Sequence, residues 1–131
     1  MTNRELIMEV LENLGYQPRV DEEDDIFIRY QMKTIFFLIR NEDEQYVSVV
    51  LPQFADVEEG EETLTLGVCN KMSRDLKIAK VYIDQTLKNV SASFEFFYTD
   101  QQSLANNVEY ALKILGMVRT IFYKAKEVYA S

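Results

Sequence analysis

A C-terminal segment, residues 104–129, is too apolar for a helix that packs on one side only. At about 100° per residue its apolar side chains form two neighbouring stripes that cover more than half of the circumference. The first stripe consists of Leu104, Val108, Ala111, Leu112, Leu115, Val118 and Phe122, and the second of Tyr110, Ile114, Met117, Ile121 and Val128. A helix docked on a sheet needs an apolar arc of only about 100°. The surplus must therefore be covered by another helix of the chain, by a second copy or by a partner protein.

The second stripe is the candidate interface. If the chain's own first helix covers it, the stripe is ordinary core, whereas cover by another protein makes it a binding surface. The residues that we expect at a dimer or partner interface are Tyr110, Ile114, Met117 and Ile121.

The N-terminal residues have the pattern of an amphipathic helix over 3–14, with apolar side chains on one face and glutamates on the other. Thr2, three residues before Glu5, is typical of a capping box, and Gly15 suits a left-handed stop. We therefore expect the first helix to begin directly after Thr2 and to end just before Gly15.

Polar turns separate the remaining elements. Strands are expected over residues 26–30, 34–40, 46–51, 78–84 and 90–99, and helices over 56–74 and from about 100 to 129. Asp56 is the expected cap of the middle helix, and Thr99 or Asp100 that of the last. The short connection 85–89 predicts a hairpin. The order α-β-β-β-α-β-β-α predicts an α+β fold with an antiparallel sheet.

The strand over 34–40 differs from an ordinary half-exposed strand. Residues 35–39 are all apolar, so both faces of this strand carry apolar side chains. A sheet that is open to water on one side shows alternation of apolar and polar residues instead. We therefore expect cover on both faces of the sheet at this strand.

Length and charge limit the classes of protein. The 131 residues suit a single domain, 1–131, with one hydrophobic core. A net charge of -8 repels nucleic acid and anionic membranes, so neither is expected as a partner. The sequence shows no signal peptide and no run as long as a membrane span. A single cysteine, Cys69, fits a reducing compartment, which favours the cytoplasm.

Patterns for catalysis and ligand binding are missing from the sequence. The chain has no histidine, and its four glycines form no phosphate-binding loop. The acidic run 21–25 lacks the spacing of an EF-hand loop and is interpreted as a solvated turn. Cys69, without a histidine to activate it, is interpreted as a small apolar helix residue. We expect no enzyme activity, no cofactor and no metal.

Three segments carry a family likeness: DDIFIRYQMKTIFFLIRNEDEQYVSVVLPQF, CNKMSRDLKIAKVYID, and SASFEFF ahead of a long helix. They resemble the YbjN-like family of bacterial sensory-transduction regulators, whose fold is similar to that of type III secretion chaperones. The resemblance implies a small acidic protein that dimerises and binds other proteins through sheet and helix surfaces. The most family-like positions are Asn70, Lys71 and Lys80. By position alone, Asn70 and Lys71 suit the carbonyl end of a helix, and Lys80 suits a side chain that extends to water.

Surplus apolar surface without catalytic chemistry favours a non-enzymatic protein-interaction module, chaperone-like or regulatory. We expect a homodimer that offers an apolar surface with an acidic rim to a partner segment. The alternative is a small-ligand sensor with a pocket between sheet and helix. That pocket would be lined by Phe36, Phe94, Phe96 and Tyr98, which are otherwise core residues.

Overall fold

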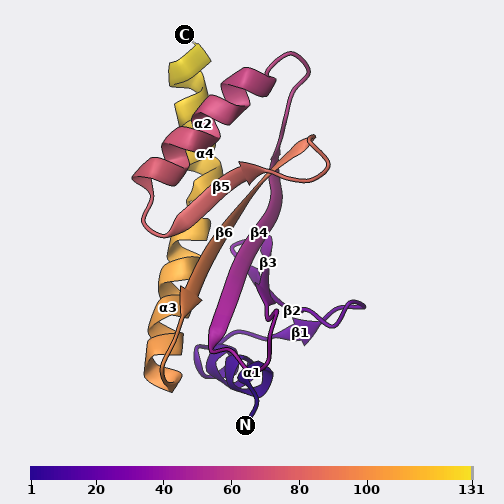
Figure 1. Ribbon diagram of the computed structural model, residues 1–131, viewed down its shortest axis with the longest axis vertical. Helices are drawn as coiled ribbons and strands as arrows, with labels where there is room; N and C mark the ends of the chain where they lie inside the picture. The colour runs from indigo at the N-terminus through magenta and orange to yellow at the C-terminus, as the bar shows by residue number, and fades with distance from the viewer. Residues whose placement is uncertain (131) are drawn as a thin grey trace.

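The computed structural model describes residues 1–130 and has an α+β fold, as predicted. Six strands form one antiparallel sheet in the order β1-β2-β3-β4-β6-β5. The elements are α1 (Asn3–Asn13), β1 (Arg19–Val20), β2 (Ile26–Tyr30), β3 (Lys33–Leu38), β4 (Tyr46–Asp56), α2 (Glu62–Asp75), β5 (Ala79–Ile83), β6 (Asn89–Phe97), α3 (Gln101–Leu115) and α4 (Val118–Ala130). The α3 and α4 helices run along the sheet, α2 crosses α4, and α1 lies at the end of the molecule that holds the N-terminus (Figure 1).

The helix ends follow local capping signals. The Thr2 hydroxyl accepts a hydrogen bond from the Glu5 N–H at 3.1 Å, and the Glu5 carboxylate accepts one from the Thr2 N–H at 3.3 Å. The predicted capping box of α1 is therefore confirmed. Gly15 has a φ of +95°, the left-handed conformation expected of a helix stop. Asp100 caps α3 by accepting a hydrogen bond from the Ser103 N–H at 2.8 Å.

One face of the sheet and all four helices build the hydrophobic core. Strand residues alternate between the two faces, so Ile26 and Ile28 of β2 point inward together with Ile35 and Phe37 of β3. The first apolar stripe of the C-terminal segment is at most 1% exposed throughout, at Leu104, Val108, Ala111, Leu112, Leu115, Val118 and Phe122. The helical phase predicted for this stripe is therefore confirmed.

The C-terminal helix is broken, whereas the sequence predicted one continuous helix. α3 ends at Leu115 and α4 begins at Val118. At the break, a Cβ on Gly116 would lie 3.0 Å from the Tyr30 ring and 3.1 Å from the Gln31 amide oxygen. The β2–β3 hairpin thus approaches the helix backbone at a glycine. Because glycine is also a weak helix former, the helix yields at this point.

β4 is longer, and α2 starts later, than the sequence predicted. The strand expected over 46–51 extends to Asp56, and α2 begins only at Glu62. Asp56 pairs with Asn89 of β6, so its prediction as a helix cap is wrong. A register shift that begins after Leu51 interrupts the alternation of side chains. This irregularity hides the second half of the strand from pattern analysis.

Both outer edges of the sheet are blunted. The Ser73 hydroxyl of α2 accepts a hydrogen bond from the Val81 N–H at 2.8 Å and donates one to the Val81 carbonyl at 3.1 Å, which occupies the edge of β5. The opposite edge strand, β1, has only 2 residues. Covered or very short edges discourage strand addition. Another strand is therefore not readily added at either edge of this sheet.

The helices cover only one face of the sheet, so the prediction of cover on both faces of β3 is wrong. Ile35 and Phe37 are at most 1% exposed beneath the helices, while Phe36 and Leu38 point the other way and are only half-buried. Within residues 1–130 the helices pack on the Ile35 side or against the β5 edge. The apolar side chains of β3 therefore lie on two different faces of the sheet, one that the helices bury and one that is partly exposed.

The predicted pocket between sheet and helix is not formed. Phe94, Phe96 and Tyr98 are buried in the core, at 1%, 7% and 3% exposure. Phe36 pairs with Val50, and Val50 pairs with Ser93, so these three side chains point to the same face of the sheet. Phe94 is the next residue after Ser93 in β6, so its side chain points to the opposite face. Because the sheet separates Phe36 from the other aromatic rings, these four side chains cannot line one cavity.

Candidate functional site

The face of the sheet opposite the helices, called here the open face, carries apolar and aromatic side chains that are not fully buried. They are Phe27, Phe36, Leu38, Tyr46, Val50, Tyr82 and Phe97. The strand register places Phe36 between Phe27 on β2 and Val50 on β4. Three small buried residues, Ser48, Ser91 and Ser93, lie on the same face between these larger side chains.

One end of the open face is a basin of about 690 Å³, called here the acidic basin. Its apolar floor consists of Phe27, Phe36, Leu38 and Val50, and its wall of Val20, Asp21, Glu22, Glu23 and Asp25. The rings of Phe27 and Phe36 pack with centroids 5.8 Å apart. The basin thus places four carboxylates beside an apolar surface.

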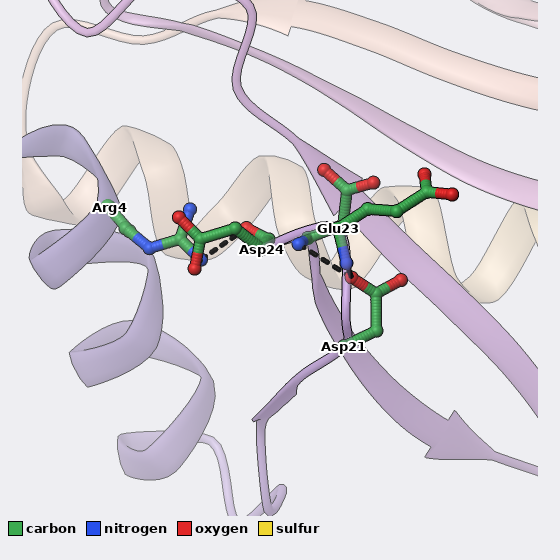
Figure 2. A network of polar contacts seen from close by, with 5 residues as sticks. Arg4, Asp21, Glu23 and Asp24 are labelled. Carbon is green, nitrogen blue, oxygen red and sulfur yellow. Dashed lines mark hydrogen bonds and ion pairs between the residues drawn. The ribbon is translucent and has the colours of Figure 1, made fainter.

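The loop that forms this acidic wall is held in place by its own contacts (Figure 2). The Asp21 carboxylate accepts hydrogen bonds from two backbone N–H groups of the loop, each at 2.9 Å. Arg4, from α1, pairs with the Asp24 carboxylate at 3.1 Å and also donates to the Asp24 carbonyl. Glu22 and Glu23 are exposed, and within residues 1–130 their carboxylates have no hydrogen bond or ion pair. Asp21 and Asp24 therefore shape the loop through their carboxylates, whereas the carboxylates of Glu22 and Glu23 extend into solvent.

The other end of the open face is a basin of about 560 Å³, called here the polar basin. Its central carboxylate, Glu95, accepts a hydrogen bond from the Tyr46 hydroxyl and pairs with Lys80 at 2.9 Å. The bond to Glu95 raises the pKa of Tyr46 to about 12. Burial acts to raise the pKa of Glu95, but the bonds from Tyr46 and Lys80 outweigh it and hold the pKa below its usual value. Arg40 lines the same basin.

The two basins are neighbours that share Leu38 and Val50 in their lining, and together they are called here the groove. Acidic residues surround one end of the groove. Apolar side chains occupy its middle. The lining of the other end contains two cations, Arg40 and Lys80, and a single carboxylate, Glu95. The open face therefore combines an apolar surface with opposite charges at its two ends.

The Tyr46–Glu95 pair lies in the polar basin of the groove. Glu95 remains ionised and Tyr46 remains protonated near neutral pH, so this pair is not set for proton transfer. Within residues 1–130, no three histidine, cysteine or acidic residues converge to hold a metal ion. In the same part of the chain, no helix combines the length and apolarity needed to cross a membrane.

Comparison with known proteins places the chain in a family. The family model YbjN, described as "Putative bacterial sensory transduction regulator", matches residues 3–115. The chain belongs to the YbjN family. Among solved structures, it is similar to the "Crystal structure of YbjN, a putative transcription regulator from E. coli", with a TM-score of 0.67 and 11% identity over 95% of this chain and 91% of that chain. At this identity the likeness shows a shared fold. No curated protein matches the sequence.

These comparisons confirm the resemblance to the YbjN family and the α+β fold. The family description concerns regulation, which agrees with the coarser part of the functional prediction. The likeness to type III secretion chaperones, which the resemblance also implied, stays a prediction.

The positions with the strongest YbjN likeness lie in two places. Asn70 is exposed on α2, and Lys71 forms an ion pair with Asp75 one turn later, which differs from the expected capping of helix carbonyls. Lys80 lines the polar basin, where it binds Glu95. Of the three positions, Lys80 alone lines a basin of the open face.

The predicted helix interface is divided between core and surface. Tyr110 and Met117 are 61% and 44% exposed on α3 and at the α3–α4 break. Ile114 and Ile121 are half-buried against the core. Cover by the rest of the chain is therefore incomplete along this stripe. Its role as an interface stays a prediction.

Cys69 lies on the core side of α2 and is 4% exposed. Burial raises the pKa of its thiol to about 11. The thiol is therefore protonated near neutral pH and is a poor nucleophile. Its interpretation as a small apolar residue agrees with this environment.

Sequence reasoning missed the open face as a site. Its main signal is the apolar run 35–39, which by itself predicts a strand that is covered on both sides. The acidic run 21–25 was interpreted as a solvated turn, because nothing in the local sequence indicates that it borders Phe27 and Phe36. Pairing between strands brings these segments together.

Proposed function

We propose that this YbjN-family protein is a non-enzymatic regulatory module that acts as a homodimer and binds a segment of a partner protein on the open face of its sheet. The supporting observation is the row of Phe27, Phe36 and Val50, which the chain's own helices leave uncovered. Removal of apolar surface from water contributes about 25 cal/mol per Å². A partner that covers this row therefore gains free energy without any chemical step.

The shape of the groove favours a protein segment over a small ligand. Sites for small molecules bury most of the ligand in a closed pocket. Here two broad, open basins adjoin at Leu38 and Val50, so a small molecule in either one would remain largely in water. A peptide segment can contact both basins at once.

Dimerisation is proposed through the outer side of α3 and α4. Tyr110 and Met117 are exposed there, and half-buried Ile114 and Ile121 extend the same stripe. This side faces away from the sheet, whereas the open face lies on the opposite side of the sheet. A dimer formed through the helices therefore leaves both grooves free for partner segments.

The proposal is tested by titrating isotope-labelled protein with a synthetic peptide and following backbone amide NMR signals. The peptide has an apolar middle and charged ends, and is about 14 residues long, which suits a helix of about 20 Å. We expect shifts concentrated on β2, β3, β4 and β6. Shifts confined to α3 and α4, or none at all, would contradict the proposal.

A pair of variants distinguishes specific binding in the groove from nonspecific hydrophobic binding to exposed side chains. Phe36→Ser removes an aromatic ring from the floor of the acidic basin, and we expect about ten-fold weaker peptide binding. Leu87→Ser is the matched control, because Leu87 is 73% exposed and lines neither basin. Circular dichroism verifies that both variants are folded. Equal loss of affinity in the two variants would argue against a specific groove.

A further inference from the structure

The charges along the groove give the open face a direction. Resting on the proposed function, we infer that the partner segment has basic residues at one end, an apolar middle and acidic residues at the other end. Its basic end lies in the acidic basin and its acidic end lies in the polar basin. The chain thus recognises the order of charges in its partner as well as its apolar surface.

The acidic basin requires a basic end. Its lining contains four carboxylates and no lysine or arginine. Arg4 neutralises Asp24, which lies outside the lining, whereas Glu22 and Glu23 have no ionic partner within residues 1–130. Like charges brought next to them would be repelled, and a lysine or arginine would be attracted. Because Glu22 and Glu23 are exposed, each such attraction is modest and weakens as the salt concentration rises.

The polar basin has the opposite excess of charge. Glu95 is already paired with Lys80 at 2.9 Å and is bonded to Tyr46. Arg40 lines this basin and, within residues 1–130, its side chain has no hydrogen bond or ion pair. Among the residues that line this basin, the one unpaired charge is therefore positive, while the Glu44 carboxylate, outside the lining, also acts on the Tyr46 hydroxyl. An acidic residue of the partner satisfies Arg40, whereas a basic residue is repelled by it.

Strand spacing sets the length of the segment. Phe27 on β2 and Lys80 on β5 are separated by four strand-to-strand steps. At about 4.8 Å per step, the groove is roughly 19 Å across. A helix of about 13 residues spans this distance. The apolar middle of such a segment lies over Leu38 and Val50, which join the two basins.

Three synthetic peptides of about 14 residues test the charge order. They share one apolar middle and carry lysines at one end with glutamates at the other, lysines at both ends, or glutamates at both ends. We expect the first peptide to bind about ten-fold more tightly than either of the others at low salt, with the advantage reduced at high salt. Isothermal titration calorimetry measures the affinities.

A spin label shows which end lies where. On the lysine end of the mixed peptide, the label should broaden the NMR signals of Glu22 and Glu23. On the glutamate end, it should broaden those of Arg40 and Lys80. The reversed pattern, or equal broadening of both basins, would overturn the inferred direction.

Charge variants identify the residues responsible. Glu22→Gln combined with Glu23→Gln should lower the affinity for the mixed peptide, which has lysines at one end and glutamates at the other, by about two- to five-fold for each charge removed. The matched control is Glu58→Gln with Glu59→Gln, which removes the same net charge from exposed positions that line neither basin. Arg40→Gln should remove the penalty against the peptide with lysines at both ends.

The outcomes distinguish this inference from the proposed function. If no peptide shifts the open face, the proposed function fails, and the inference fails with it. If all three peptides bind the open face equally, the function stands and the charge order is wrong. Sedimentation of the free protein tests whether a second copy of the chain covers the open face. If Phe36→Ser converted a dimer to a monomer, both the proposed function and the inferred charge order would be overturned.

Discussion

The hydroxyl of Tyr46 on β4 donates a hydrogen bond to the carboxylate of Glu95 on the neighbouring strand β6. This bond raises the pKa of Tyr46 to about 12 from its ordinary value of 10.0. The folded state therefore holds the phenolic proton more tightly than the unfolded state. The resulting stabilisation is complete below pH 10 and is lost as the pH rises to about 12.

Tyr46→Phe tests this linkage. At neutral pH, we expect the variant to be about 1 kcal/mol less stable than the wild type, because it lacks the hydrogen bond. As the pH rises from 10 to 12, the stability of the variant should fall less than that of the wild type. Urea unfolding at several pH values measures both effects. Tyrosinate absorbance should also lack the titration step of highest pKa. Parallel pH dependence in the two proteins would show that the bond to Glu95 is not formed.

Two glycine-to-alanine substitutions in helical segments should change the free energy of unfolding in opposite directions. Gly116→Ala places a Cβ 3.0 Å from the Tyr30 ring, so we expect a loss of about 1 kcal/mol in the free energy of unfolding. Gly67→Ala lies within α2 with no atom within 4 Å of the added carbon, and should gain about 0.5–1 kcal/mol from helix propensity. Denaturant unfolding measures both. A gain of stability in Gly116→Ala would show that the β2–β3 hairpin moves away from the added carbon at little cost.

Met117→Glu tests the helix interface. Met117 is 44% exposed, so the monomer should remain folded. In a symmetric dimer the change buries two unpaired carboxylates, which costs several kcal/mol of association. We expect sedimentation to show a folded monomer, with Gln102→Glu as a control that remains dimeric. A Met117→Glu protein that stays dimeric would place the dimer interface elsewhere.

Cys69→Ser separates packing from reactivity. The thiol is 4% exposed, so a hydroxyl in its place should cost about 1–3 kcal/mol of stability. Peptide binding at the open face should be unchanged. Because burial raises the pKa of Cys69 to about 11, a thiol reagent should modify the folded protein far more slowly than the unfolded protein. Loss of peptide binding in a folded variant would assign Cys69 a direct role.

Divalent cations should leave the thermal midpoint unchanged. The acidic loop already uses Asp21 to bind its own backbone and Asp24 to bind Arg4. Coordination of calcium would have to break these contacts. Melting curves with millimolar calcium and with a chelator test this, since a ligand that binds the folded state raises its stability. A rise of several degrees with calcium would reveal a metal site in the loop.

The ends of α1, the start of α3 and the core stripe were accessible from the sequence because they depend on nearby residues. The capping box at Thr2 needs only Glu5, and the buried face of α3 follows from helical phase. The break at Gly116 was not accessible, because its cause is Tyr30, a residue far away in the sequence. The end of β4 at Asp56 was hidden for a similar reason, since its partner is Asn89 on another strand.

The sequence by itself determined the α+β class, the buried stripe of the last helix and the family, since local periodicity and capping encode the first two and residue similarity carries the third. Only the tertiary structure decided that Phe36 lies on an uncovered face and that the acidic loop borders it. An apolar run specifies that both sides of a strand are apolar, but not which side the helices cover. That choice depends on strand order and helix placement, because many distant contacts must form together.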